Sequence, residues 1–99
     1  MSRPRNKNSS RYQFHFRNVD SDPHLEKNAN LRLVQLLALA PSDASAIGVL
    51  EKDKKHYFSS VVVQSRYCTF QEKAAATTPD SAVRRALEKL ENRLYEWRA

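Results

Sequence analysis

Two helix-start signals divide this 99-residue chain and limit the folds that it can adopt. Asp22 precedes Pro23, and Thr78 precedes Pro79. An Asp or Thr side chain caps free N–H groups of a first helical turn, and proline fits that turn because it lacks an N–H. Each signal opens a stretch with apolar residues at spacings of three and four, which predicts two amphipathic helices. We expect the first helix to end at Pro41.

The two predicted helices each carry a single apolar stripe. The members of both stripes are Leu25, Ala29, Leu33, Leu36, Leu37 and Ala40 in the first helix, and Ala82, Val83, Ala86, Leu87, Leu90, Leu94 and Trp97 in the second. A helix with one apolar stripe buries that side against another element and leaves the other side in water. Both helices should therefore cover one face of a sheet.

Four further segments are typical of β-strands. Residues 12–19 alternate aromatic and polar side chains, and residues 46–50, 57–64 and 68–75 follow between the helices. We expect a charged turn over 51–55 and another turn over 65–67. Strands joined by tight turns are antiparallel, whereas strands on either side of a helix are parallel when adjacent. The expected fold is α+β, ordered β-α-β-β-β-α: a four-stranded mixed sheet with two helices on one face and the other face partly open to water.

The net charge of +6 is unevenly distributed along the chain. Residues 1–17 contain five Lys or Arg and no acid, whereas residues 18–99 contain the other 12 against all 11 acids. We expect residues 1–10 to form a disordered basic arm and residues 11–99 to form one domain. Basic arms attract nucleic acid, although such a tail can also be merely solvated.

Composition argues against several classes of protein. One glycine in the chain leaves no phosphate-cradling loop, and one cysteine, Cys68, fits a reducing compartment and a small buried role. Three scattered histidines lack metal-site spacing, and no carboxylate pair is set apart from neighbouring Lys or Arg. No apolar run is long enough to span a membrane. We expect a cytoplasmic protein that is not an enzyme, without catalytic residues, metal, cofactor or small-molecule substrate.

The cationic residues of the predicted domain suggest a nucleic-acid interface. Arg85, Lys89 and Arg93 are spaced by four, so they form one ridge on the second helix. Long cationic side chains on a rigid helix can meet several backbone phosphates at once. Exposed helix faces are commonly charged, however, so solvation alone also explains the ridge. The candidate nucleic-acid-binding residues are Lys89, Arg85, Arg93, Lys52, Lys54, Lys55, Arg32 and Arg84.

The chain resembles the ribosome hibernation-promoting factor family, also called ribosome-associated inhibitor A or sigma-54 modulation proteins, in its short form. Residues 79–94 (PDSAVRRALEKLENRL) are similar to the family's final helix, and residues 18–25 (NVDSDPHL) to its first strand-to-helix junction. Leu50-Glu51-Lys52 with His56 resembles the second strand and its basic hairpin. The resemblance covers residues 12–97.

This resemblance implies a stress-response factor that binds ribosomal RNA of the small ribosomal subunit near the decoding centre, and we expect the chain to be a monomer off the ribosome. There it would block messenger and transfer RNA, using basic residues of both helices and the hairpins. Lys89 carries over best, then Lys52, with Arg32, Arg85 and Arg93 after them.

The first helix departs from the family pattern. Leu31, Val34, Gln35 and Ala38 occupy positions where lysines are common in the family. The alternative is therefore a regulatory protein-interaction module, for example for a sigma factor, that uses the apolar first helix and the open sheet face. Tyr12, Phe14, Phe16 and Tyr67 are interpreted as core or sheet residues rather than as platforms for stacking bases.

Overall fold

The computed structural model describes residues 11–20 and 22–98. The basic arm predicted for residues 1–10 lies outside the described residues. The elements are β1 (Tyr12–Arg17), α2 (Pro23–Leu39), β2 (Ser45–Asp53), β3 (His56–Gln64), β4 (Thr69–Ala76) and α3 (Pro79–Arg98). No helix of this described part is long and apolar enough to cross a membrane.

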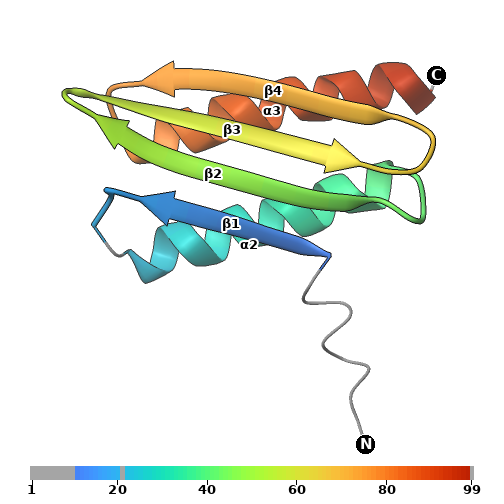
Figure 1. The fold of residues 1–99 in the computed structure, drawn as a ribbon, viewed down its shortest axis with the longest axis horizontal. Coiled ribbons are helices and arrows are strands. Elements are labelled where there is room, and N and C mark those ends of the chain that lie inside the picture. The colour runs from blue at the N-terminus through green and yellow to red at the C-terminus, as the bar shows by residue number, and fades with distance from the viewer. Residues whose placement is uncertain (1–10, 21, 99) are drawn as a thin grey trace, which may run out of the picture.

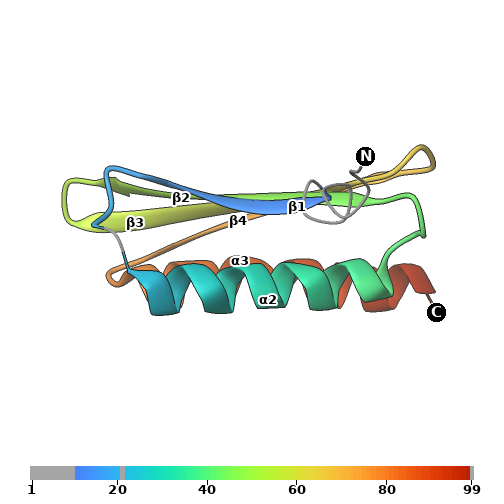
Figure 2. The ribbon, with the colours of Figure 1, turned by 90° about the horizontal axis from the view of Figure 1, so that it is seen from below.

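The four strands form one mixed sheet in the order β1-β2-β3-β4 (Figure 1). β1 pairs with β2 in parallel, and β2, β3 and β4 are successively antiparallel. Both helices lie on the same face of the sheet, α2 behind β1 and α3 behind β4 (Figures 1 and 2). The predicted fold class, strand pairing and helix placement are therefore confirmed.

Both predicted helix caps are present. The Asp22 side chain accepts hydrogen bonds from the backbone N–H groups of His24 (3.1 Å) and Leu25 (3.2 Å). The Thr78 hydroxyl accepts one from the N–H of Ser81 at 3.3 Å. Each cap satisfies N–H groups that the first helical turn leaves free. Both helices start at the end of the sheet that carries the β2–β3 hairpin (Figure 1).

The core lies between the sheet and the two helices. Its largest fully buried side chains include Leu33 from α2, Leu50 from β2 and Leu90 from α3. Under β1, the buried ring of Phe14 packs directly on Gly48 of the neighbouring strand, where a Cβ atom would lie 2.3 Å from the ring. The chain's single glycine therefore makes room for Phe14 at its register partner.

Several predicted boundaries were wrong by a few residues. β1 ends at Arg17 because Asn18 adopts a φ of 55°, a left-handed conformation that asparagine tolerates better than most residues. The turn predicted over 51–55 is reduced to Lys54 and Lys55, with a φ of 60° at Lys54, because β2 stays paired as far as Asp53. β4 begins at Thr69, one residue after Cys68.

Three predicted environments also differ in the structure. Cys68 is half-buried rather than buried. Trp97 is 45% exposed because it lies at the rim of the α3 stripe, where its ring packs edge-on against Phe70. Tyr67 is 76% exposed in the β3–β4 turn, so its interpretation as a core or sheet residue was wrong.

Candidate nucleic-acid interface

The ridge of Arg85, Lys89 and Arg93 runs along the free edge of β4. Arg85 Nη1 donates to the carbonyl of Ala75 at 3.1 Å, and Lys89 Nζ donates to the carbonyl of Lys73 at 2.9 Å. β4 is an edge strand, so its outward carbonyls have no strand partner. The ridge side chains therefore lie across the seam between α3 and β4, which we call the β4 edge.

These contacts fix the cationic groups without using up their hydrogen-bonding capacity. An ammonium has three N–H donors and a guanidinium has five. The two carbonyl acceptors, Lys73 and Ala75, are two residues apart, so they are spaced about 6.8 Å along this antiparallel strand. Arg85 and Lys89 are both exposed. The β4 edge thus presents a row of positioned cations with free donors to solvent.

Arg93 differs from the other two members of the ridge. Its Nη1 lies 2.6 Å from Glu72 Oε2, and its guanidinium lies 5.6 Å from the centroid of the Phe70 ring. The Glu72 carboxylate neutralises this cation locally and competes with any phosphate for its donors. Arg93 is therefore a weaker candidate for an anion contact than Arg85 or Lys89.

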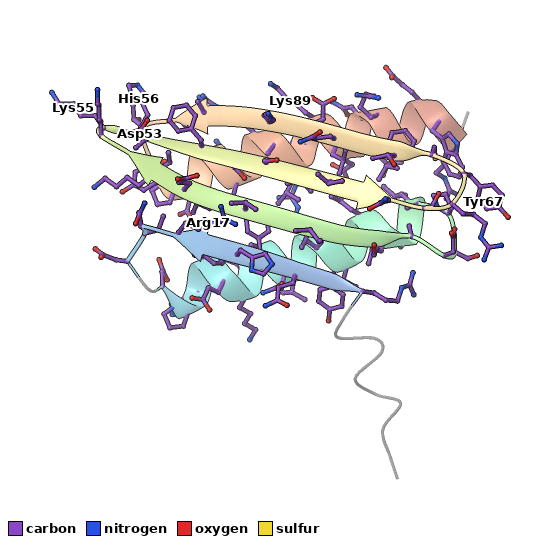
Figure 3. The ribbon with its side chains drawn as sticks, viewed as in Figure 1. Arg17, Asp53, Lys55, His56, Tyr67 and Lys89 are labelled. Atoms are coloured by element: carbon purple, nitrogen blue, oxygen red, sulfur yellow. The ribbon has the colours of Figure 1, made fainter. Side chains whose placement is uncertain are left out.

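The β2–β3 hairpin separates its three lysines. Lys54 and Lys55 form the exposed turn of the hairpin, and Lys55 lies at one end of the molecule (Figure 3). Lys52 instead places its Nζ 5.6 Å from the centroid of the Tyr57 ring and lines a hollow with Asp20 and Asp22. A cation over an aromatic face is already partly compensated.

Arg32 and Arg84 lie in a third place, the groove between α2 and α3. They line this groove with Asn28 and Asp80. Arg84 thus points toward α2, whereas Arg85 points toward β4. The structure therefore does not bring the eight predicted residues into one patch: it distributes them over the β4 edge, the hairpin and the interhelical groove.

Sequence reasoning missed Lys73 as a neighbour of the ridge. Its side chain is exposed and lines, with Lys89, Phe58 and Ala75, a hollow that extends from the β4 edge onto the open sheet face. The alternation of side chains along β4 could have predicted its position, because buried Phe70 and Ala76 place the even-numbered residues toward the helices. Lys73 must then face away from them.

The carboxylates, histidines and cysteine do not form a metal centre. Among residues 11–20 and 22–98, no three His, Cys, Asp or Glu side chains are grouped so that they could hold a metal ion. The described part contains 14 Lys or Arg against 11 Asp or Glu, so its cations are distinguished by their placement at the β4 edge and not by their number.

Two solved structures share this fold. The N-terminal domain of Protein Y from Thermus thermophilus superposes with a TM-score of 0.74 and 16% identity, covering 86% of this chain and 94% of that domain. A ribosomal subunit interface protein from Coxiella burnetii superposes with a TM-score of 0.71 and 19% identity, covering 88% of this chain and 96% of that protein. No protein-family model and no curated protein matches the sequence. The resemblance of fold predicted from the sequence is thus confirmed.

Proposed function

We propose that this chain is a ribosome-associated factor that binds ribosomal RNA of the small subunit near the decoding centre and inhibits translation. The observation that carries the proposal is the row of anchored cations on the β4 edge. The fold supports the proposal, because a ribosomal subunit interface protein from Coxiella burnetii has the same fold. In this role the chain acts in the cytoplasm during stress.

The mechanism would be steric and electrostatic. Cationic side chains neutralise phosphates and release their counterions, which supplies affinity that falls with salt. The folded domain then occupies space that messenger and transfer RNA need. No bond is made or broken, so the activity requires neither catalytic residues nor a cofactor.

The contacts of each cation rank the eight candidates. Arg85 and Lys89 come first, because they are exposed and anchored by neutral carbonyls. Lys54 and Lys55 follow at the hairpin tip. Arg93 is partly neutralised by Glu72, and Lys52 is turned onto Tyr57. Arg32 and Arg84, in the interhelical groove, would contact RNA through a separate face.

The test is co-sedimentation with isolated small ribosomal subunits across a salt series. We expect saturable binding near one chain per subunit, competed by messenger or initiator transfer RNA. The double substitution Arg85→Glu with Lys89→Glu should abolish it, because two phosphate contacts become repulsions. Lys27→Glu with Arg17→Glu changes the net charge equally at exposed positions off the β4 edge and should retain most binding.

Three results would contradict the proposal. Binding no stronger than that of a charge-matched basic peptide would exclude the ribosome as a specific partner. Equal loss in the two double variants would show that net charge, rather than the β4 edge, holds the RNA. Unchanged binding of the folded Arg85→Glu, Lys89→Glu variant would place the contact elsewhere.

A protein-interaction role is the second candidate, and exposed apolar side chains favour it. Leu31 on α2 is 51% exposed, and Ile47 and Phe58 on the open sheet face are 51% and 46% exposed. Apolar contacts are insensitive to salt and nuclease. A partner retained in pull-downs after high salt and nuclease treatment would support this role, and ribosome binding that disappears under both would favour the first.

A further inference from the structure

The open face of the sheet carries exposed aromatic rings near the β2–β3 hairpin. Phe58 on β3 is 46% exposed. His56, at the hairpin end of the same strand (Figure 3), has its ring centroid 6.4 Å from that of Phe58. Buried Ser59 and Val61 place the odd-numbered residues of β3 toward the helices, so both rings lie on the opposite side of the sheet. Neighbouring aromatic rings on an open sheet face are a platform on which unpaired nucleobases stack.

A hollow lies beside the Phe58 ring, and we call it the Phe58 hollow. Its volume is about 560 Å³, and its lining includes Phe58, Ala75, Lys73 and Lys89. Ala75 is the register partner of Phe58 on β4, and its small side chain leaves space on that side of the ring. A hollow of this volume falls within the range of small-ligand sites. It is therefore large enough to accept a nucleobase against the ring.

The charged residues of the Phe58 hollow lie on opposite sides of the ring. On the β4 side are Lys73 and Lys89, and the Lys89 Nζ is held by the Lys73 carbonyl at 2.9 Å. On the β2 side is Glu51, the register partner of Phe58. Within the described part of the chain, Glu51 forms no ion pair, although Arg17 is its register partner on β1. The hollow is thus cationic on one side of the ring and anionic on the other.

This order of charges matches a single unpaired nucleotide. A nucleotide has an anionic phosphate at one end and N–H groups on the outer edge of its base. A base stacked on Phe58 would direct its phosphate toward the lysines and its edge toward the Glu51 carboxylate. An acidic peptide fits less well, because the same carboxylate would repel it. A duplex fits less well too, because its bases are already stacked and paired.

We propose that the Phe58 hollow binds an unpaired nucleotide of single-stranded RNA. Phe58 stacks on the base, Lys73 and Lys89 contact the phosphate, and Glu51 accepts a hydrogen bond from an amino group of the base. Cytosine carries such an amino group where uracil carries a carbonyl oxygen, so the site favours cytosine over uracil. The proposal rests on the proposed RNA-binding function and specifies which form of RNA the β4 edge receives.

Fluorescence anisotropy of the full chain with labelled short RNAs tests the stacking. We expect oligocytidine to bind more tightly than a base-paired duplex of the same length. Phe58→Leu keeps an apolar side chain but removes the aromatic face, so it should weaken oligocytidine binding by about tenfold and leave duplex binding unchanged. Phe58→Tyr should retain the original affinity. Ile47→Ala, at an apolar residue of the open face that is 51% exposed and lies outside the hollow, is the matched control and should change neither.

The choice of base tests the role of Glu51. Oligocytidine should bind about fivefold more tightly than oligouridine, as expected for one specific contact to a base edge. Glu51→Gln should raise both affinities but narrow their ratio, because an amide can accept from cytosine and can also donate to uracil. Asp53→Asn makes the same charge change outside the hollow and should leave the ratio as it was.

Three results would overturn the proposal: oligocytidine binding that Phe58→Leu does not weaken, equal weakening of duplex binding, or a base ratio that Glu51→Gln leaves unchanged. Stronger competition by an acidic peptide than by unlabelled oligocytidine would overturn it in favour of a protein partner. Small-subunit binding that persists in the original chain after any of these results would keep the proposed function. Binding of single strands that depends on Phe58, without binding to small subunits, would keep the nucleotide site and remove the ribosomal role.

Discussion

The two edge strands of this sheet, β1 and β4, both have main-chain groups without a strand partner, but the surroundings of these groups differ. At β4, Arg85 and Lys89 reach from α3 and bond the outward carbonyls of Ala75 and Lys73. At β1, no side chain from residues 11–20 or 22–98 bonds the outward main-chain groups, and the neighbouring helix flank presents Val34. A sheet edge lined with cations discourages another strand and attracts anions, whereas a bare edge beside apolar side chains attracts a strand.

This difference between the two edges suggests two roles for the cationic ridge: blocking another strand and binding phosphates. The sequence pattern alone cannot distinguish these roles. Lys and Arg on edges are a common means of preventing edge-to-edge association. The same positioned cations can also hold phosphates. If both roles apply, the residues that recruit RNA also protect the β4 edge from protein partners. The following predictions test each edge separately.

The largest expected effect is on the attachment of β1. Gly48→Ala should lower the free energy of unfolding by about 2 kcal/mol, because the new Cβ overlaps the Phe14 ring. Glycine-to-alanine changes inside strands otherwise tend to stabilise, by about 0.5–1 kcal/mol. Urea denaturation measures the loss, and amide exchange should quicken in β1 more than in β4.

A double-mutant cycle identifies the cause of that loss. Adding Phe14→Leu to Gly48→Ala should recover part of the stability, because a smaller side chain accommodates the new Cβ. The losses of the two substitutions could instead be strictly additive, or the Gly48→Ala variant could be more stable than the original chain. Either result would show that Gly48 is not required to make room for the Phe14 ring.

The next largest effect is a gain in stability at β3, the strand that pairs with β4. Ser59 is fully buried on β3, and its Oγ has no hydrogen-bond partner within the described part of the chain. Ser59→Ala removes this unsatisfied hydroxyl and should raise the free energy of unfolding by about 1 kcal/mol. Urea denaturation with an unchanged m-value would check it. A stability decrease would mean that the hydroxyl is satisfied in solution.

Uncovering the β4 edge should have a smaller effect on stability but a visible one on association. Lys89→Met keeps most of the aliphatic stem and removes the group that bonds Lys73, so we expect a loss of about 0.5 kcal/mol for an exposed hydrogen bond. With Arg85→Met added, β4 becomes a second bare edge. Light scattering should then show larger species than the original chain forms at the same concentration.

The sequence predicted the elements well because their signals are local. The pairs Asp22-Pro23 and Thr78-Pro79 predict where the helices begin. The alternation of apolar and polar side chains predicts which residues of each strand face inward. It could not predict that Glu51, Lys52 and Asp53 remain paired, because cross-strand partners such as Phe58 and Tyr57 hold them in the ladder. Charged residues there resemble a turn until the opposite strand is known.

The candidate site was predictable as a list but not as a surface. The spacing of four placed Arg85, Lys89 and Arg93 on one side of α3. Only tertiary contacts reveal that this side of α3 lies against the edge of β4. The same contacts separate Arg84 from its neighbour Arg85 and engage Arg93 with Glu72. Which cations are free depends on carbonyls and carboxylates from a distant strand, and no helical period contains that information.

The smallest predicted effect concerns the ion pair between Arg93 and Glu72. Glu72→Gln keeps the size of the side chain at β4 but removes the charge that occupies Arg93. The freed guanidinium should strengthen binding to small ribosomal subunits by a few-fold at low salt and make the salt dependence steeper by up to about one unit, as for one added phosphate contact. Because the pair is partly exposed, with side-chain exposures of 47% at Arg93 and 22% at Glu72, stability should change by less than about 1 kcal/mol. Glu26→Gln, an equal charge change in the first turn of α2 and away from the β4 edge, separates the release of Arg93 from the general rise in net charge. If both substitutions strengthen binding equally, Arg93 contributes through the overall field and not through a contact of its own.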